Sequence, residues 1–429
     1  MRSTVRSAQE SFWFLPAIFG LVAILLAQGL VTLDRTFADA ISALPFFREL
    51  SADGGRSILT TVGTSMLTVA GTSFSITISV LATTSSTYGP RLVRNFMADR
   101  ANQFVLAMFT STFLYALVVL RAVRTSIGDR VAFVPTLGIH VAVVVAVVDA
   151  AVLVFFIHHI ASSVQITTLQ GRVQRDLMRA VDRTHPAELA PGWSRTEVPP
   201  DPRSSSITTT KDGYVQHADL DGLLQIAARC DVAFDVAVMP GDYVVDGDPL
   251  VFVRGGRKAA EKTVRAVRNA FTIDGERTPE QDVRFALQQL IEVAVRGLAS
   301  GTNDPYTTVS ALDLARVALV PLVLREEAPR ARFDETGVLR LAFTWPTTES
   351  LVDDVFDGVR RYGSAHQAVV TASLNLAGRL GAVARSTALR GRLAQKVDEL
   401  VTAYARTSPD APDLRSVRAR AEEVLSSLH

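Results

Sequence analysis

The first 160 residues of this chain contain four long hydrophobic runs, separated by short polar segments. The runs occupy residues 12–33, 58–86, 104–122 and 137–160. Each run is long enough for a helix to cross the hydrocarbon core of a bilayer once. The first run lacks a short core followed by a small-residue cleavage site, so we expect a retained helix and not a signal peptide. The pattern therefore predicts a four-helix transmembrane domain over residues 1–165.

The second run differs from the others because 14 of its 29 residues are Ser or Thr. At about 100° per residue, eight of these hydroxyl residues fall within roughly 80° of arc on a helix. They are Thr61, Ser65, Thr68, Thr72, Ser75, Ser79, Thr83 and Ser86. We call this set the hydroxyl stripe.

The hydroxyl stripe has two interpretations. Ser and Thr oxygens can replace part of an ion's hydration shell, so a ring of such helices can surround a hydrated pore. Alternatively, small polar residues allow membrane helices to pack closely. Eight residues in register exceed what packing alone requires, but the sequence leaves both interpretations open.

An acidic residue, Asp149, lies near the middle of the fourth run. With antiparallel helices it falls at about the depth of residues 68–72 and 110–112. A carboxylate at that depth costs several kcal/mol unless it is protonated, paired or hydrated. We predict that Asp149 lines the polar path and attracts cations or relays protons, or that it is a protonated packing residue.

Basic residues flank the hydrophobic runs unevenly, which predicts the orientation of the chain. They lie before the first run (Arg2, Arg6), between the second and third (Arg91, Arg94, Arg100) and after the fourth (Arg172, Arg175, Arg179). Positive charge favours the cytoplasmic side, so we expect both termini and the region after about residue 165 to be cytoplasmic. Tyr88, Arg91 and Arg94 would then lie at the inner mouth of a path, where they can gate it, bind anionic lipid or pair with acidic groups.

After the fourth run the pattern changes to that of a soluble α+β domain. We expect a helical extension and Pro-rich linker at 166–205 and a small β module at 206–256. A mainly helical domain follows at 257–429, with a short β element near 336–344. The turns in residues 240–249 resemble the hairpin of a biotinyl or lipoyl barrel-sandwich module. Without the Asp-Lys or Met-Lys pair that acylation needs, a structural barrel-sandwich is the better prediction.

The strongest polar cluster outside the membrane part consists of Arg277, Asp282, Arg296, Asn303 and Asp304. The Gly-Thr-Asn-Asp-Pro turn at 301–305 places an amide and a carboxylate at the start of a helix. This arrangement can bind a cation or a polar ligand, or it can simply cap the helix.

Composition excludes several classes of function. The chain has 44 basic and 43 acidic residues, so its charge does not favour a nucleic-acid partner. A single cysteine, Cys230, excludes an intramolecular disulfide. Without a Walker loop, GxGxxG, HExxH or zinc-ligand spacing, we predict no cofactor, no metal site and no catalytic residues.

Several segments together resemble a family of bacterial membrane proteins known as domain of unknown function 2254. They are residues 88–103, 213–219, 240–250, 277–282 and 300–305. The resemblance implies a multi-span protein of the bacterial inner membrane with a cytoplasmic domain, and it implies no established activity.

From the residues we predict a homo-oligomer in the lipid bilayer that acts as an ion channel or transporter, with an inorganic ion as its substrate. The second helix would line the path and the cytoplasmic domain would assemble or gate it. The alternative is a non-conducting scaffold or sensor whose cytoplasmic domain binds a protein or a small ligand.

Overall fold

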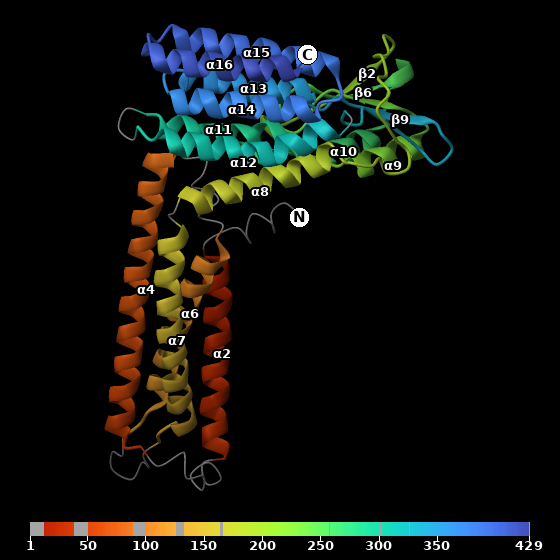
Figure 1. The fold of residues 1–429 in the computed structure, drawn as a ribbon. Coiled ribbons are helices and arrows are strands. Elements are labelled where there is room, and N and C mark those ends of the chain that lie inside the picture. The colour runs from red at the N-terminus through yellow and green to blue at the C-terminus, as the bar shows by residue number, and fades with distance from the viewer. Residues whose placement is uncertain are drawn as a thin grey trace. The chain divides into compact units, whose positions relative to one another are not determined.

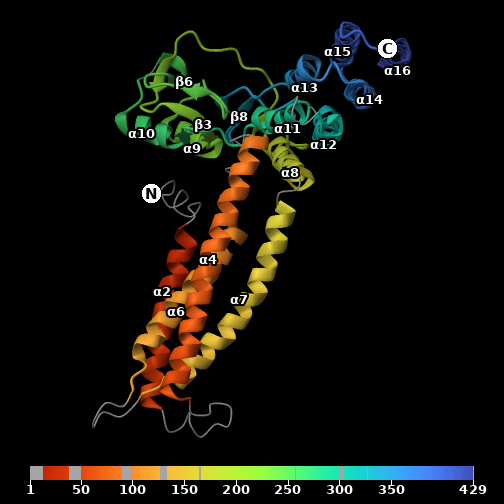
Figure 2. The ribbon, with the colours of Figure 1, turned by 90° about the vertical axis from the view of Figure 1, so that its left-hand side faces the viewer.

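The computed structural model describes residues 13–37, 50–88, 99–125, 133–163, 166–256, 258–299, 303–325 and 327–428. The chain divides into two compact units, Met1–Thr168 and Leu169–His429 (Figures 1 and 2). We call them the helical bundle and the second unit.

The helical bundle contains four long helices. They are α2 (Phe14–Thr36), α4 (Ala52–Tyr88), α6 (Arg100–Ala122) and α7 (Thr136–Ser163). Half of the apolar window of α6 is buried, against 17–22% in the other three helices. Since α6 also contacts each of the others, it is the central helix of the bundle.

The bundle interior holds two separate apolar clusters. The first apolar cluster lies near the α6–α7 connection and includes Leu59, Tyr115, Val119 and Ile139. The second apolar cluster, toward the opposite end, consists of Ala70, Val105, Phe109, Phe156 and Ile160. Small residues let α4 approach its neighbours closely: a Cβ at Gly63 would lie 3.7 Å from the Cβ of Ala116.

The start of α7 is fixed by side chains from two other helices. Asp34 of α2 accepts hydrogen bonds from the backbone amides of Leu137 and Gly138, each at 3.1 Å. Tyr115 of α6 donates its hydroxyl to the carbonyl oxygen of Gly138 at 2.8 Å. Because the first amides of a helix have no partner within the helix, Asp34 supplies one from outside.

The structure contains a fifth helix that is long and apolar enough to cross a membrane, so the predicted count of four is not confirmed. This helix, α12 (Pro305–Leu324), belongs to the second unit. It packs against α11 (Val283–Gly297) and α14 (Gln367–Val383), and half of its apolar window is buried.

The β part of the second unit does not confirm the expected barrel-sandwich. Its larger sheet has the strand order β1-β8-β9-β4-β6-β2, and its smaller sheet has the order β5-β3-β7. The larger sheet contains β1 (Trp193–Ser194), β2 (Ser205–Thr208), β4 (Phe234–Val236), β6 (Pro249–Val253), β8 (Ala331–Phe333) and β9 (Leu339–Ala342). The smaller contains β3 (Gly213–Ala218), β5 (Tyr243–Val244) and β7 (Phe271–Asp274).

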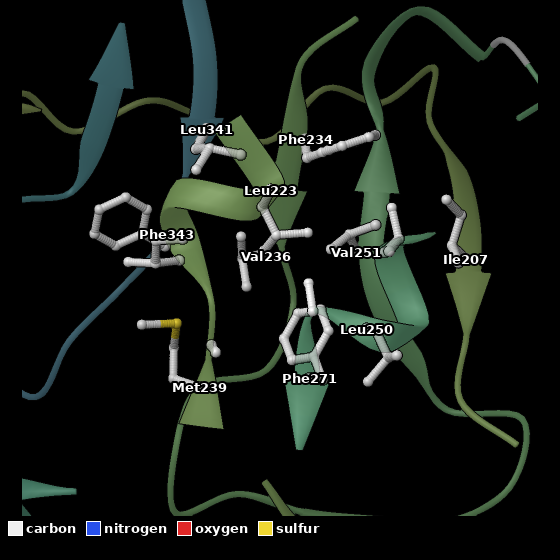
Figure 3. Close-up of a cluster of buried hydrophobic side chains, with 14 of the residues drawn as sticks. Ile207, Leu223, Phe234, Val236, Met239, Leu250, Val251, Phe271, Leu341 and Phe343 are labelled. Atoms are coloured by element: carbon white, nitrogen blue, oxygen red, sulfur yellow. The ribbon is translucent and has the colours of Figure 1, made fainter. Parts of the chain in front are cut away.

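The larger sheet is completed by strands that lie far apart in the sequence. β4 pairs in parallel with β9, with Phe234 opposite Leu341, whereas its pairing with β6 is antiparallel. The buried side chains of Leu223, Phe234, Val251 and Leu341 pack together in the core (Figure 3). Strands from outside residues 206–256 therefore share one core with that segment.

Two short helices complete the β part, α9 (Leu220–Cys230) and α10 (Glu261–Asn269), with a 3-10 turn at Arg254–Gly256. The remaining helices form two neighbouring rows, in which α13 packs between α11 and α15, and α14 packs between α12 and α16 (Figure 1). Their bounds are Thr348–Tyr362 for α13, Thr387–Ala405 for α15 and Ala411–Leu428 for α16. The amphipathic α8 (Ile166–Thr184) joins this unit through Gln170, whose amide donates to the Thr307 carbonyl at 3.1 Å.

Candidate functional site: a hydroxyl face and a buried carboxyl

The hydroxyl stripe lies on the surface of the helical bundle. Seven of its eight residues are exposed: Thr61, Ser65, Thr68, Thr72, Ser75, Ser79 and Thr83. The eighth, Ser86, lies near the end of α4, where only the backbone is described. The described stripe therefore does not face the interior of its own bundle.

The buried face of α4 lies almost opposite the stripe. It is formed by Leu59, Gly63, Ala70, Ser73 and Thr77, which are all buried. At about 100° per residue, these positions centre more than 140° from the centre of the stripe. The helix therefore packs on its neighbours in the described part of the bundle through the face opposite the hydroxyl stripe.

The exposed threonines of the stripe make hydrogen bonds within α4. The hydroxyls of Thr61, Thr68, Thr72 and Thr83 each donate to the carbonyl oxygen four residues earlier, at 2.8–3.0 Å. A hydroxyl that donates in this way keeps lone pairs that can accept. These residues thus present oxygen acceptors toward the surroundings.

The serines of the stripe differ from the threonines. Within the described part of the chain, the hydroxyls of Ser65, Ser75 and Ser79 make no hydrogen bond. In hydrocarbon, an unpaired hydroxyl donor has no water to bond with and is unfavourable. These three residues favour contact with water or with another polar surface.

Asp149 does not lie on the hydroxyl stripe. It is 1% exposed, inside the bundle on α7, beside Thr112 of α6, which is also 1% exposed. The expectation that Asp149 and the stripe line one surface is therefore not met in the single subunit. Of the predicted inner-mouth residues, Tyr88 ends α4 with only its backbone described, while Arg91 and Arg94 lie outside the described residues.

The polar cluster predicted outside the membrane part divides into two groups. Arg277 and Asp282 lie at the start of α11, and Arg296, Asn303 and Asp304 lie at its other end. The fifteen residues of α11 span about 22 Å. The five residues therefore do not form one site.

The first group is a buried ion pair that also caps α11. Asp282 is 4% exposed and accepts hydrogen bonds from Arg277 Nε at 2.8 Å and from the Phe285 amide at 2.8 Å. Arg277 also stacks over the Phe285 ring. Burial raises the pKa of the Asp282 carboxyl, while Arg277 and the Phe285 amide oppose that shift.

Two of the segments that resemble the family meet at this ion pair. Gly241, in the turn after Met239, has φ +105° and lies directly against the Asp282 carboxylate, which leaves no space for a Cβ. A glycine is required there both for its backbone conformation and for its lack of a side chain.

The second group caps α12. Asp304 accepts hydrogen bonds from the amides of Tyr306 and Thr307 and from the Thr307 hydroxyl at 2.7 Å. The Thr307 hydroxyl bond is the main reason that the pKa of Asp304 is lower than usual. Asn303 has φ +43°, and Arg296 Nη2 lies 3.4 Å from Glu292. Capping of α12 accounts for the contacts of Asp304, whereas the contact between Arg296 and Glu292 is an ion pair within α11.

Sequence reasoning missed the role of Asp34. This residue directly follows the first hydrophobic run, and its capping role depends on a helix about 100 residues later. The sequence did place residues 110–112 at about the depth of Asp149, and the structure puts Thr112 beside that carboxyl. Among the residues that the structure describes, no group of three His, Cys, Asp or Glu side chains has the geometry of a metal site.

Comparison with known proteins identifies relatives without a described activity. The chain is 32% identical to the uncharacterized protein Rv1290c of Mycobacterium tuberculosis over 435 residues, covering 97% of this chain and 81% of the relative. It has the same identity and coverage with the uncharacterized protein Mb1321c of Mycobacterium bovis. No solved structure matches the chain. The model of the family DUF2254, described as predicted membrane proteins, matches residues 9–377, and this multi-pass membrane protein belongs to that family.

Proposed function

We propose that this protein is a homo-oligomer in which the α4 helices of neighbouring subunits line a polar, ion-conducting path. The observation that carries the proposal is the position of the hydroxyl stripe, which is exposed and lies opposite the face by which α4 packs in its own bundle. Around an oligomer axis, the same face would lie in water.

The chemistry of the stripe suits a cation. The exposed threonines direct acceptor lone pairs outward, and Ser65, Ser75 and Ser79 can bind water as donors or acceptors. Rings of oxygen atoms can replace part of the hydration shell of an ion in a pore. The apolar side chains of Leu67, Phe74, Ile76 and Ile78 are exposed beside the stripe and would pack between subunits.

We further propose that α2, α4, α6 and α7 cross the inner membrane and that α12 remains in a cytoplasmic second unit. Near its middle α12 carries Asp313 and Arg316, which are 61% and 48% exposed in their side chains. An exposed ion pair at mid-helix is unfavourable in hydrocarbon. The distribution of basic residues around the bundle supports a cytoplasmic position for both termini.

The conduction proposal is tested by ion flux into liposomes that contain the purified protein. We expect Thr72→Leu combined with Ser75→Leu to reduce flux about tenfold, which corresponds to a barrier about 1.4 kcal/mol higher. Leucines at these positions would form an apolar constriction that excludes water. The matched control is Val144→Leu combined with Val147→Leu, which changes exposed positions of α7 away from the stripe and should leave flux unchanged.

Two results would contradict the proposal. Equal flux in the Thr72/Ser75 variant and in the control would make the stripe a packing face, and no flux from the unaltered protein would favour a non-conducting scaffold. Oligomerisation is measured separately with Ser75→Cys in a Cys230→Ser background, because Cys230 is the only natural cysteine. Cysteines near a shared axis should crosslink, whereas Val147→Cys on the exposed face of α7 should not.

A further inference from the structure

Two buried polar side chains lie in the middle of the helical bundle, between its two apolar clusters. Asp149 comes from α7 and Thr112 from α6, and each is 1% exposed. The two helices pack against each other, and Thr112 lies beside the carboxyl. This group lies inside one subunit and is separate from the hydroxyl stripe.

The side-chain oxygens of these two residues lack hydrogen-bond partners. The hydroxyl of Ser111, the residue before Thr112, donates to the Met108 carbonyl at 2.8 Å. In contrast, neither carboxyl oxygen of Asp149 nor Oγ1 of Thr112 has a partner among the described residues. Buried polar atoms without partners are uncommon and need an explanation.

Apolar side chains close this position on both sides. Along α6, Thr112 lies between Phe109 of the second apolar cluster and Tyr115 of the first. Along α7, Asp149 lies between Ala142 of the first cluster and Phe156 of the second. Exchange with solvent therefore requires one of these clusters to open.

No basic side chain in the described part of the bundle balances the charge of an Asp149 carboxylate. Apart from Tyr115, which lies about one turn from Thr112 on α6, the other titratable side chains of α2, α6 and α7 lie toward the helix ends. Asp34, His140, Tyr115, Arg35 and Arg121 lie on the side of the first apolar cluster, and His158, His159, Asp99 and Arg100 lie at the opposite end. The exposed Asp53 and Arg56 lie at the first turn of α4. An unpaired carboxylate in such a place costs several kcal/mol, which binding of a proton removes.

We propose that Asp149 is a proton-binding site inside the bundle, where the neutral carboxylic acid is held beside the Thr112 hydroxyl. A metal cation fits less well, because a hard cation takes six or more oxygen ligands and this position offers three free oxygens. The proposal concerns one subunit and does not depend on the proposed oligomer or on conduction.

The test is infrared spectroscopy of the full-length protein in liposomes at neutral pH, where a carboxylic acid has a C=O band distinct from that of a carboxylate. We expect such a band in the unaltered protein, its loss in Asp149→Asn, and its shift to higher frequency in Thr112→Val, which removes the neighbouring hydroxyl. Asp53→Asn removes an exposed carboxyl on α4 and should leave the band unchanged. Identical spectra for the unaltered protein and Asp149→Asn would overturn the proposal.

A second measurement does not require a variant. A hydrophobic carbodiimide takes the proton of a carboxylic acid on one nitrogen and bonds its central carbon to the carboxyl oxygen. The adduct then rearranges to a stable N-acylurea, so Asp149 gains the whole mass of the reagent. We expect mass spectrometry to find this label at Asp149 and to show less of it as the pH rises. Protection by sodium or potassium ions at constant pH would instead identify a cation site and overturn the proposal.

Discussion

Replacing Asp282 with alanine is expected to lower the free energy of unfolding of the second unit by about 3 kcal/mol. The change removes the cap of α11 and leaves the Arg277 guanidinium, whose side chain is only 21% exposed, without its carboxylate. Loss of one partner from a buried ion pair is costly because the remaining charge stays partly desolvated. Arg277 can turn toward water, which places the effect at the lower end of the usual range for such pairs.

Tryptophan fluorescence in a Trp13→Phe background can measure this effect in the full-length protein. The chain has three tryptophans, and Trp193 and Trp345 both belong to the core of the second unit. Fluorescence in this background therefore reports unfolding of that unit alone.

The matched control is Asp304→Ala, because Asp304 also caps a helix but forms no ion pair with any residue that the structure describes. Loss of a cap costs about 1 kcal/mol. If both variants lower the free energy of unfolding equally, the ion pair between Arg277 and Asp282 adds no stability beyond the helix cap that Asp282 provides.

The hydroxyl stripe was predictable from the sequence because helical periodicity depends only on residue order. The direction in which the stripe faces could not be predicted, because it depends on which face of α4 packs against α6. In hindsight, Leu59, Gly63, Ala70 and Ser73 gave a weak signal, since small residues at helical spacing favour close packing. The sequence offered no reason to prefer this face as the packing surface over the hydroxyl stripe, which contains more small residues.

The polar cluster shows the limit of reading proximity from sequence. Arg277 and Asp282 are close because a short loop leads from one to the start of the helix that the other caps. Their short separation in the sequence already suggests this contact. Arg296 and Asp304 are also near each other in sequence, but they lie at the opposite end of α11, about 22 Å from Asp282. Likewise, one of the two strands that pair with β4 is β9, more than 100 residues later, and the local pattern contains no information about such pairing.

Acidification from pH 6.5 to pH 4 is expected to remove about 3 kcal/mol of stability from the second unit through His185 alone. This residue is 1% exposed, and its ring nitrogens contact the Pro346 carbonyl at 3.1 Å and the Thr184 hydroxyl at 2.9 Å. Burial lowers the pKa of His185 from 6.5 to about 4. The unfolded chain therefore binds a proton between these values that the folded chain does not bind.

The direction in which stability changes with pH follows from this difference in proton binding. The stability due to neutral His185 is fully present above pH 6.5, falls as the pH decreases toward 4, and changes no further below that value. In His185→Gln no proton can be bound, so this part of the acid dependence should disappear while that of the carboxylates remains. Denaturant titrations in the Trp13→Phe background at several pH values measure the free energy of unfolding of the second unit for each variant.

His366→Gln is the matched control, because His366 is only partly buried and precedes α14 without capping it through its side chain. The stability of this control should depend on pH in the same way as that of the unaltered protein.

The difference in the free energy of unfolding between the unaltered protein and His185→Gln should narrow from pH 7 to pH 4, because only the unaltered protein loses the contribution of neutral His185. A constant gap would mean that His185 is protonated to the same extent in the folded and unfolded chains, for instance because water reaches its ring. The acid sensitivity of the second unit would then arise from its carboxylate ion pairs.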